Sequence, residues 1–148
     1  MPMPTKLTLC LLLPTALVAA GPAESRPLKT EADARALVES CFKLFVAEDY
    51  KAGLDLFKPY WKVSMNELNT LTMQTITSRA TVKDRFGASL GYEFISERKA
   101  GASLLRFVVI EKLENTAIRY SVVFYKATDR WEMQTFIWDD KVQNLFGE

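Results

Sequence analysis

The stretch that decides the fold runs from residue 88 to residue 140 and reads ASLGYEFISERK-AG-ASLLRFVVIEKL-EN-TAIRYSVVFYKA-TD-RWEMQTFIWDD. Apolar and polar residues alternate through its four longer segments, which are rich in aromatic and β-branched residues, as is typical of half-buried strands. The residue pairs between them are short enough to be hairpin turns. The sequence therefore predicts a four-stranded antiparallel sheet, with strands at residues 88–99, 102–113, 116–127 and 130–140.

Upstream of this sheet the apolar residues recur at helical spacing, in segments at residues 30–45, 50–58 and 64–86. Ser64 with Glu67 three residues later is a capping box, a stronger start signal than Thr30 gives the first segment. Helices followed by a meander of strands are an α+β arrangement, and we expect one such domain over residues 30–148. Cys41 falls in the apolar stripe of the first helix, so we expect it to be buried.

The first 20 residues have the pattern of a cleavable signal peptide. Lys6 precedes an apolar run at residues 7–20 that ends in the small residues Ala19 and Ala20. This run is shorter than the roughly 20 apolar residues of a membrane span, so a retained anchor is the less favoured alternative. The sequence thus predicts an exported protein, periplasmic or secreted, with no stable span after signal removal and a flexible lead-in at residues 21–29.

If each hairpin turn has two residues, the register of the sheet follows, and one face is nearly all apolar and covers the helices. Its polar corner holds Glu111 and Asp139, with Tyr92 and Tyr120 one row away. This corner is the predicted ligand pocket. Two carboxylates near phenolic hydroxyls would also suit acid–base chemistry on a small apolar ligand, with Asp139 or Glu111 as the base. The alternative interpretation is that both acids are solvated or paired with Lys or Arg at the strand ends.

The opposite face of the predicted sheet is rich in aromatic and β-branched residues for a surface that meets water. The same register places Phe136, Trp138 and Arg119 there, and Arg119 could stack on the indole. Aromatic residues and Arg are enriched at protein interfaces, so these three residues are a predicted interface, most simply with a second copy of the chain. The alternative is that the C-terminal segment folds back over this face.

The composition excludes several functional classes. The formal net charge of the 148-residue chain is +1, which gives no strong field for nucleic acid, so we expect no nucleic-acid partner. The chain contains no histidine, which removes the commonest general base and zinc ligand. No phosphate loop, CxxC or calcium-loop pattern is present. The sequence predicts neither a cofactor nor a metal.

The order of elements resembles the nuclear-transport-factor-2-like, or cystatin-like, domains, including exported bacterial proteins of unknown function. The resemblance rests on Glu48-Asp49-Tyr50 after the first helix, Arg85-Phe86-Gly87 at the end of the third, and a Trp-bearing closing hairpin up to Trp138. It implies a bent, cone-like sheet wrapped around a helix, often with a pocket and often dimeric. Because the His of the enzymes on this scaffold is missing, no catalytic residue is carried over.

Three functional hypotheses follow. The first is an exported, non-catalytic domain that binds a small apolar ligand in a cone-shaped pocket, as a homodimer. The second is a protein-interaction module, an inhibitor or immunity factor, that uses the outer sheet face. The third is an isomerase-like or dehydratase-like enzyme with a carboxylate base.

Overall fold

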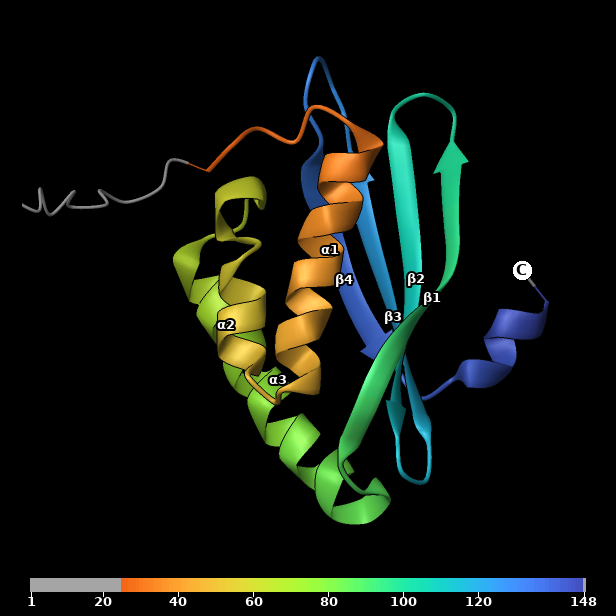
Figure 1. Cartoon of the computed structure of the whole chain (residues 1–148). Coiled ribbons are helices and arrows are strands. Elements are labelled where there is room, and N and C mark those ends of the chain that lie inside the picture. Colours follow the sequence, from red (N-terminus) through yellow and green to blue (C-terminus); the bar gives the residue numbers. More distant parts are fainter. Residues whose placement is uncertain (1–24, 148) are drawn as a thin grey trace, which may run out of the picture.

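The computed structural model describes residues 25–147, and the predicted signal peptide lies outside them. Three helices and a short 3-10 turn precede four strands, and a 3-10 helix, η2, follows them (Figure 1). The helices are α1 (Glu31–Val46), α2 (Tyr50–Asp55), η1 (Lys58–Tyr60) and α3 (Met65–Phe86), and η2 is Val142–Phe146. The strands are β1 (Ser89–Ala100), β2 (Leu104–Leu113), β3 (Ala117–Tyr125) and β4 (Glu132–Asp139).

The four strands form one antiparallel sheet in the order β1-β2-β3-β4. The helices pack on one face of this sheet, and η2 extends from its other side (Figure 1). The predicted α+β class, with helices packed on a four-stranded antiparallel sheet, is therefore confirmed.

Side-chain caps fix where the helices begin. Thr30 accepts from the backbone N–H of Asp33 at the start of α1, and Ser64 accepts from that of Glu67 at the start of α3. The acidic side chain of each pair accepts a backbone N–H in return, so both starts are complete capping boxes. Thr30 thus makes a fuller cap than its sequence pattern indicated.

The core lies between α1 and the sheet and is largely aromatic. Phe42 and Phe45 of α1 meet Tyr120 of β3 edge to face, with ring centroids 4.8 and 5.7 Å apart. Phe45 also packs against Phe136 of β4, at 5.9 Å. Cys41 is fully buried in the same cluster, as predicted, and burial raises the pKa of its thiol far above the ordinary value.

The register between β3 and β4 differs from the prediction. Near the turn Phe124 pairs with Met133 as expected, but a bulge follows, and beyond it Val123 pairs with Thr135. The bulge leaves Gln134 without a partner and shifts the pairing of the rest of β4 by one residue. Successive residues of a strand point to opposite faces, so each later side chain of β4 lies on the face opposite to the predicted one. The predicted alignment of Tyr120 with Ile137 is wrong, since Tyr120 pairs with Trp138.

The register between β1 and β2 also differs. Their turn has three residues between Ala100 and Leu104, and Gly101 takes a φ of 64°, which glycine adopts without steric cost. A second irregularity, between Phe94 and Ser96, partly offsets the register shift that the longer turn produces. Tyr92 therefore pairs with Glu111 instead of with Val109, a shift of two residues that keeps both on the predicted face.

Two segments outside the sheet pair with the chain at the start of β4. The backbone N–H of Trp131 donates to the carbonyl of Leu28 at 2.7 Å, and both side chains are buried. Trp61 forms a parallel bridge with Met133. The part of the predicted lead-in that the structure describes is therefore held against the domain at Leu28.

Candidate functional site

A buried polar cluster lies between α3 and the sheet. Glu111 of β2 is fully buried, and its carboxylate accepts from Arg79 Nη2 of α3 at 2.8 Å and from the Tyr120 hydroxyl of β3 at 2.7 Å. Arg79 Nη2 also lies 3.4 Å from the hydroxyl of Tyr50, the first residue of α2. Residues from α2, α3, β2 and β3 thus form one network around one ion pair, which we call the Arg79 cluster.

Sequence reasoning placed Glu111 and Tyr120 together, and the structure shows them hydrogen-bonded. It missed Arg79 and Tyr50. A signal for Arg79 was present in the spacing of α3, because Leu68, Thr72, Thr75 and Arg79 recur at helical intervals, and these four are the buried residues of that helix. A charged residue that continues a buried stripe points to a buried partner.

The two tyrosines of the Arg79 cluster have raised pKa values. Burial raises the pKa of Tyr120 well above its ordinary value, and the neighbouring Glu111 carboxylate adds to the shift. Burial also raises the pKa of Tyr50. Both phenols therefore keep their protons at neutral pH. The Tyr120 hydroxyl donates to Glu111, whereas the Tyr50 hydroxyl accepts from Arg79 Nη2.

Arg79 is only 1% exposed, yet part of its guanidinium has no acceptor among the described residues. Its Nε and Nη1 atoms are buried without a hydrogen bond, as is the hydroxyl of Thr75 one turn earlier in α3. Leaving a buried donor unsatisfied costs about 1–3 kcal/mol. The cluster therefore keeps unsatisfied hydrogen-bond donors in the protein interior.

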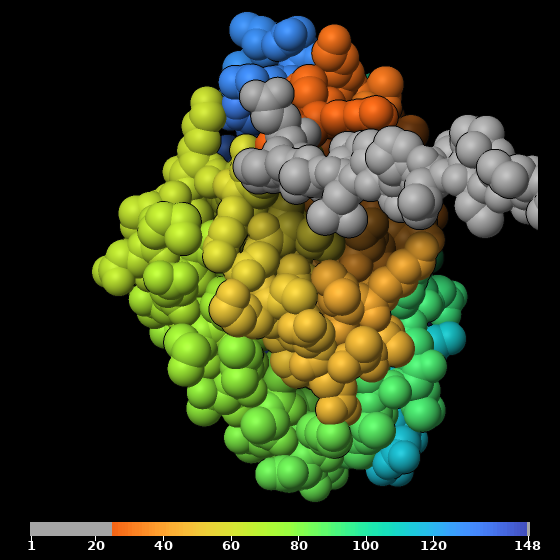
Figure 2. Space-filling model, turned by 60° about the vertical axis from the view of Figure 1, so that its left-hand side comes forward, coloured from red at the N-terminus to blue at the C-terminus, as the bar shows by residue number. Residues whose placement is uncertain are grey.

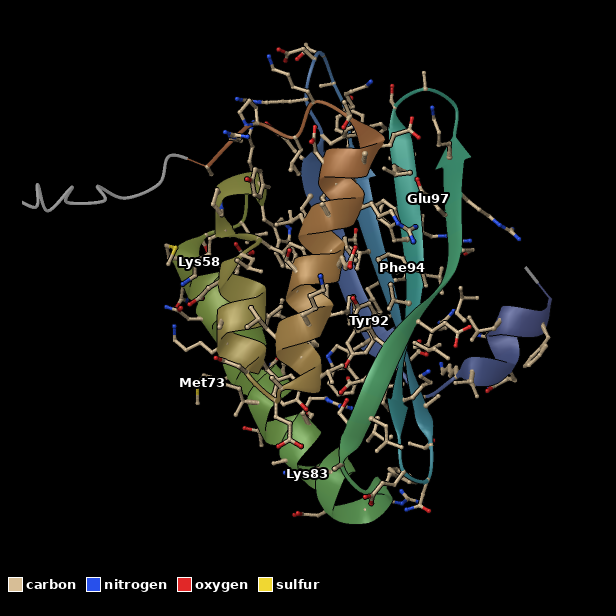
Figure 3. The ribbon with its side chains drawn as sticks, in the orientation of Figure 1. Lys58, Met73, Lys83, Tyr92, Phe94 and Glu97 are labelled. Atoms are coloured by element: carbon tan, nitrogen blue, oxygen red, sulfur yellow. The ribbon has the colours of Figure 1, made fainter. Side chains whose placement is uncertain are left out.

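Asp139 and Tyr92 do not join this cluster. The β4 bulge places Asp139 opposite Arg119, and the two form a double hydrogen bond at 2.7 and 3.0 Å on the outer side of the sheet. The prediction that Asp139 shares a face with Glu111 is therefore wrong. Tyr92 lies between β1 and α1, where its hydroxyl donates to Glu39 at 3.4 Å (Figure 3). The four residues of the predicted polar corner do not meet around one cavity.

The same bulge changes the predicted interface. Phe136 is only 6% exposed and packs on Phe45, so its predicted place on the outer face is wrong. Ile137, which is 54% exposed, points outward in its stead. Trp138 is half-buried, and its ring lies 6.3 Å from that of Tyr120. Arg119 alone of the three predicted residues keeps its predicted face.

An apolar slot of about 250 Å³ opens between the C-terminal half of α3 and the ends of β3 and β4. Val82 and Phe86 form its helical wall, and Ile118 and Trp138 form its sheet wall. Thr81, Arg85, Asp139 and Asp140 also line it. Ile118 pairs with Glu111 across the sheet, so the slot and the Arg79 cluster are neighbours. We refer to this cavity as the α3–β4 slot.

Residues 25–147 contain neither a cluster of metal-ligating side chains nor a membrane-spanning helix. No group of three or more potential metal-ligating side chains lies together in this part of the chain. None of the helices described there is long and apolar enough to cross a membrane. None of the family models, curated proteins or solved structures compared with the chain matches it.

Proposed function

We propose that this protein is an exported, non-catalytic domain that binds a small apolar ligand in the α3–β4 slot. The observation that carries the proposal is the slot itself, whose two walls are apolar and which holds polar groups to orient a ligand. Its volume of about 250 Å³ is just below the range of roughly 300–1,000 Å³ that is usual for ligand pockets, which favours a ligand of one ring. The apolar run at residues 7–20 supports export. We also propose that the fold is of the nuclear-transport-factor-2-like type that the sequence resembles.

The charged groups near the slot favour binding over catalysis. The Arg119 guanidinium holds the pKa of Asp139 below its ordinary value, which makes this carboxylate a weak base at neutral pH. The Glu111 carboxylate already accepts hydrogen bonds from Arg79 and Tyr120. Neither carboxylate is presented to the slot as a free general base.

A Thr81→Phe variant tests the slot, because residue 81 is exposed and lines it. With the unaltered protein, phenol and benzyl alcohol are expected to shift the indole N–H signal of Trp138 in NMR titrations. The variant is expected to weaken this binding at least about tenfold, since the new ring occupies the cavity. Thr77→Phe, at an exposed position of α3 that does not line the slot, is the matched control. An unchanged Trp138 signal with both probes, or equal binding by both variants, would contradict the proposal.

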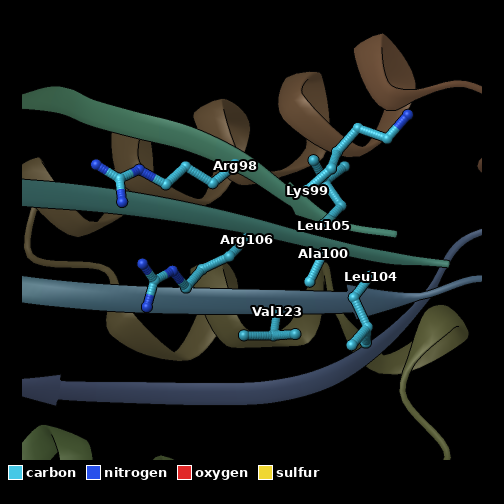
Figure 4. Close-up of a pocket in the computed structure, with 7 residues that line it drawn as sticks. All are labelled: Arg98, Lys99, Ala100, Leu104, Leu105, Arg106 and Val123. Carbon is cyan, nitrogen blue, oxygen red and sulfur yellow. The ribbon is translucent and has the colours of Figure 1, made fainter. Parts of the chain in front are cut away.

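A specific observation supports self-association as a second function. Ile95 and Ile137 are exposed on the outer sheet face, at 40% and 54%. Along β1, Glu93 lies toward one end of this face and Arg98 toward the other, beside Arg106 on β2 (Figure 4). A two-fold axis in the interface, perpendicular to the strands, would set Glu93 of each copy against Arg98 of the other. A self-complementary face of this kind is what a symmetric dimer requires.

Charge reversal tests this dimer. Glu93→Arg or Arg98→Glu alone is expected to weaken association at least about tenfold, because like charges then face each other, and the double variant is expected to restore it. Sedimentation equilibrium measures the dissociation constant. Ile137→Asp should also give monomers, whereas Met73→Asp, on exposed α3, should not change the mass. A monomeric unaltered protein, or a double variant no better than the single ones, would refute the dimer.

A further inference from the structure

The α3–β4 slot has an apolar floor and a charged rim. The floor consists of the buried and half-buried apolar residues Val82, Phe86, Ile118 and Trp138. The rim consists of the exposed lining residues Thr81, Arg85 and Asp140. The C-terminal half of α3, which supplies Arg85, extends beyond α2 on the helical side of the molecule (Figure 2). A ligand in the slot therefore meets apolar groups below and charged groups at the opening.

Asp140 supplies the anionic group of the rim. It follows the last residue of β4, and its backbone carbonyl accepts from the N–H of Val142. Its carboxylate forms no hydrogen bond or ion pair within residues 25–147. The neighbouring Asp139 is different, because Arg119 donates to its carboxylate twice, at 2.7 and 3.0 Å. Asp140 is therefore the lining carboxylate that is available to a ligand.

Arg85 supplies the cationic group of the rim, from the helical wall. Its guanidinium carbon lies over the ring of Phe86, 4.7 Å from the ring centre, which fixes the side chain beside the floor. This contact uses one side of the guanidinium, whereas a carboxylate binds to the N–H groups along its edge. In the part of the chain that the structure describes, no carboxylate pairs with Arg85. The rim thus has a positioned donor as well as an acceptor.

The charges of the slot balance. Arg119 offsets Asp139, which leaves Arg85 and Asp140 as one positive and one negative group that do not pair with each other. A ligand with a single charge would match one of these groups and meet a like charge at the other. A head group with both charges matches both. In an α-amino acid the ammonium and the carboxylate leave the same carbon in different directions, and the side chain leaves in a third.

We propose that the α3–β4 slot binds a free aromatic α-amino acid, with the ring on the apolar floor. This inference rests on the ligand site proposed above, and it adds a zwitterionic head group to the ligand of one ring. The ammonium donates to Asp140 and the carboxylate accepts from Arg85. The ring packs against Phe86 and Trp138, because aromatic rings attract each other in offset and edge-to-face contacts. L-phenylalanine is the probe that combines these features.

NMR titration of the protein with four compounds, followed at the indole N–H of Trp138, tests the proposal. L-phenylalanine carries both charged groups, 3-phenylpropionate lacks the ammonium, 2-phenylethylamine lacks the carboxylate, and benzyl alcohol lacks both. Each singly charged compound is expected to bind at least about threefold more weakly than L-phenylalanine, because exposed charge pairs contribute modestly. Salt at about 1 M should narrow this difference, since it screens exposed charges, and should not weaken the binding of benzyl alcohol.

Substitutions at the two rim charges assign each contact. Asp140→Asn is expected to remove the preference for L-phenylalanine over 3-phenylpropionate, because the acceptor of the ammonium loses its charge. Arg85→Gln is expected to remove the preference over 2-phenylethylamine for the corresponding reason. Both variants should bind benzyl alcohol as the unaltered protein does, which shows that the slot is intact. Asp84→Asn, at an exposed position of α3 that does not line the slot, is the matched control and should keep both preferences.

The outcomes separate the head group from the slot. If benzyl alcohol binds but L-phenylalanine binds no more tightly than the singly charged compounds, the head group is overturned and the slot remains a ligand site. Unchanged preferences in both Asp140→Asn and Arg85→Gln would refute the two contacts. If none of the four compounds shifts the Trp138 signal, the slot is not a site for aromatic ligands, and both proposals fail.

Discussion

Replacing Glu111 by glutamine is expected to lower the free energy of unfolding by about 3–5 kcal/mol, one of the two largest effects that we anticipate. Glu111 is fully buried, and its only charge partner in the cluster, Arg79, is 1% exposed. Glutamine keeps nearly the same shape but leaves the guanidinium charge without a counterion in the protein interior. Urea denaturation followed by circular dichroism measures the loss.

A triple variant provides the matched control. Arg79→Met, Glu111→Leu and Tyr120→Phe together remove the charges and the hydroxyl that depends on them. Replacing a whole buried ionic network by apolar groups of similar size is often neutral or stabilising, so this variant is expected to be more stable than Glu111→Gln alone. If Glu111→Gln remains within about 1 kcal/mol of the unaltered protein, the buried pair does not have the role that its geometry indicates.

Phe136→Ala is expected to cost about 3–5 kcal/mol, whereas Ile137→Ala is expected to cost less than about 1 kcal/mol. Phe136 is buried against Phe45, Phe57 and Tyr120, so its removal leaves a cavity. Ile137 is more than half exposed and loses little contact. The same urea experiment on the two variants measures both costs.

This neighbouring pair tests the register of β4 directly. The register first predicted from the sequence puts Ile137 inside and Phe136 outside, and it therefore expects the opposite order of stabilities. A more damaging substitution at Ile137 than at Phe136 would show that the bulge at Gln134 is absent in solution.

Most of the fold could be predicted because its signals are local. A capping box at Ser64, a weaker cap signal at Thr30 and the helical spacing of apolar residues located α1 and α3. Alternation located all four strands to within a few residues. The register could not be predicted, because it depends on a three-residue turn at Gly101 and on a bulge at Gln134. Neither irregularity changes the alternating pattern enough to be recognised from one sequence.

The candidate site was predicted only in part, for the same reason. Glu111 and Tyr120 lie on adjacent strands whose pairing was correctly predicted, so their contact followed. Asp139 lies beyond the bulge and was placed on the wrong face. Arg79 reaches Glu111 from a helix, and no rule of strand pairing describes which helix covers which strand.

The sheet order has a consequence for how quickly this chain can fold. Each strand pairs with its neighbour in sequence, so every step of sheet assembly closes a short loop at a small entropic cost. The bridge between Leu28 and Trp131 is different, because it joins residues from the two ends of the domain. We expect burial of Trp131 to be among the last events of folding, so its fluorescence would report completion of the domain and not the start of collapse.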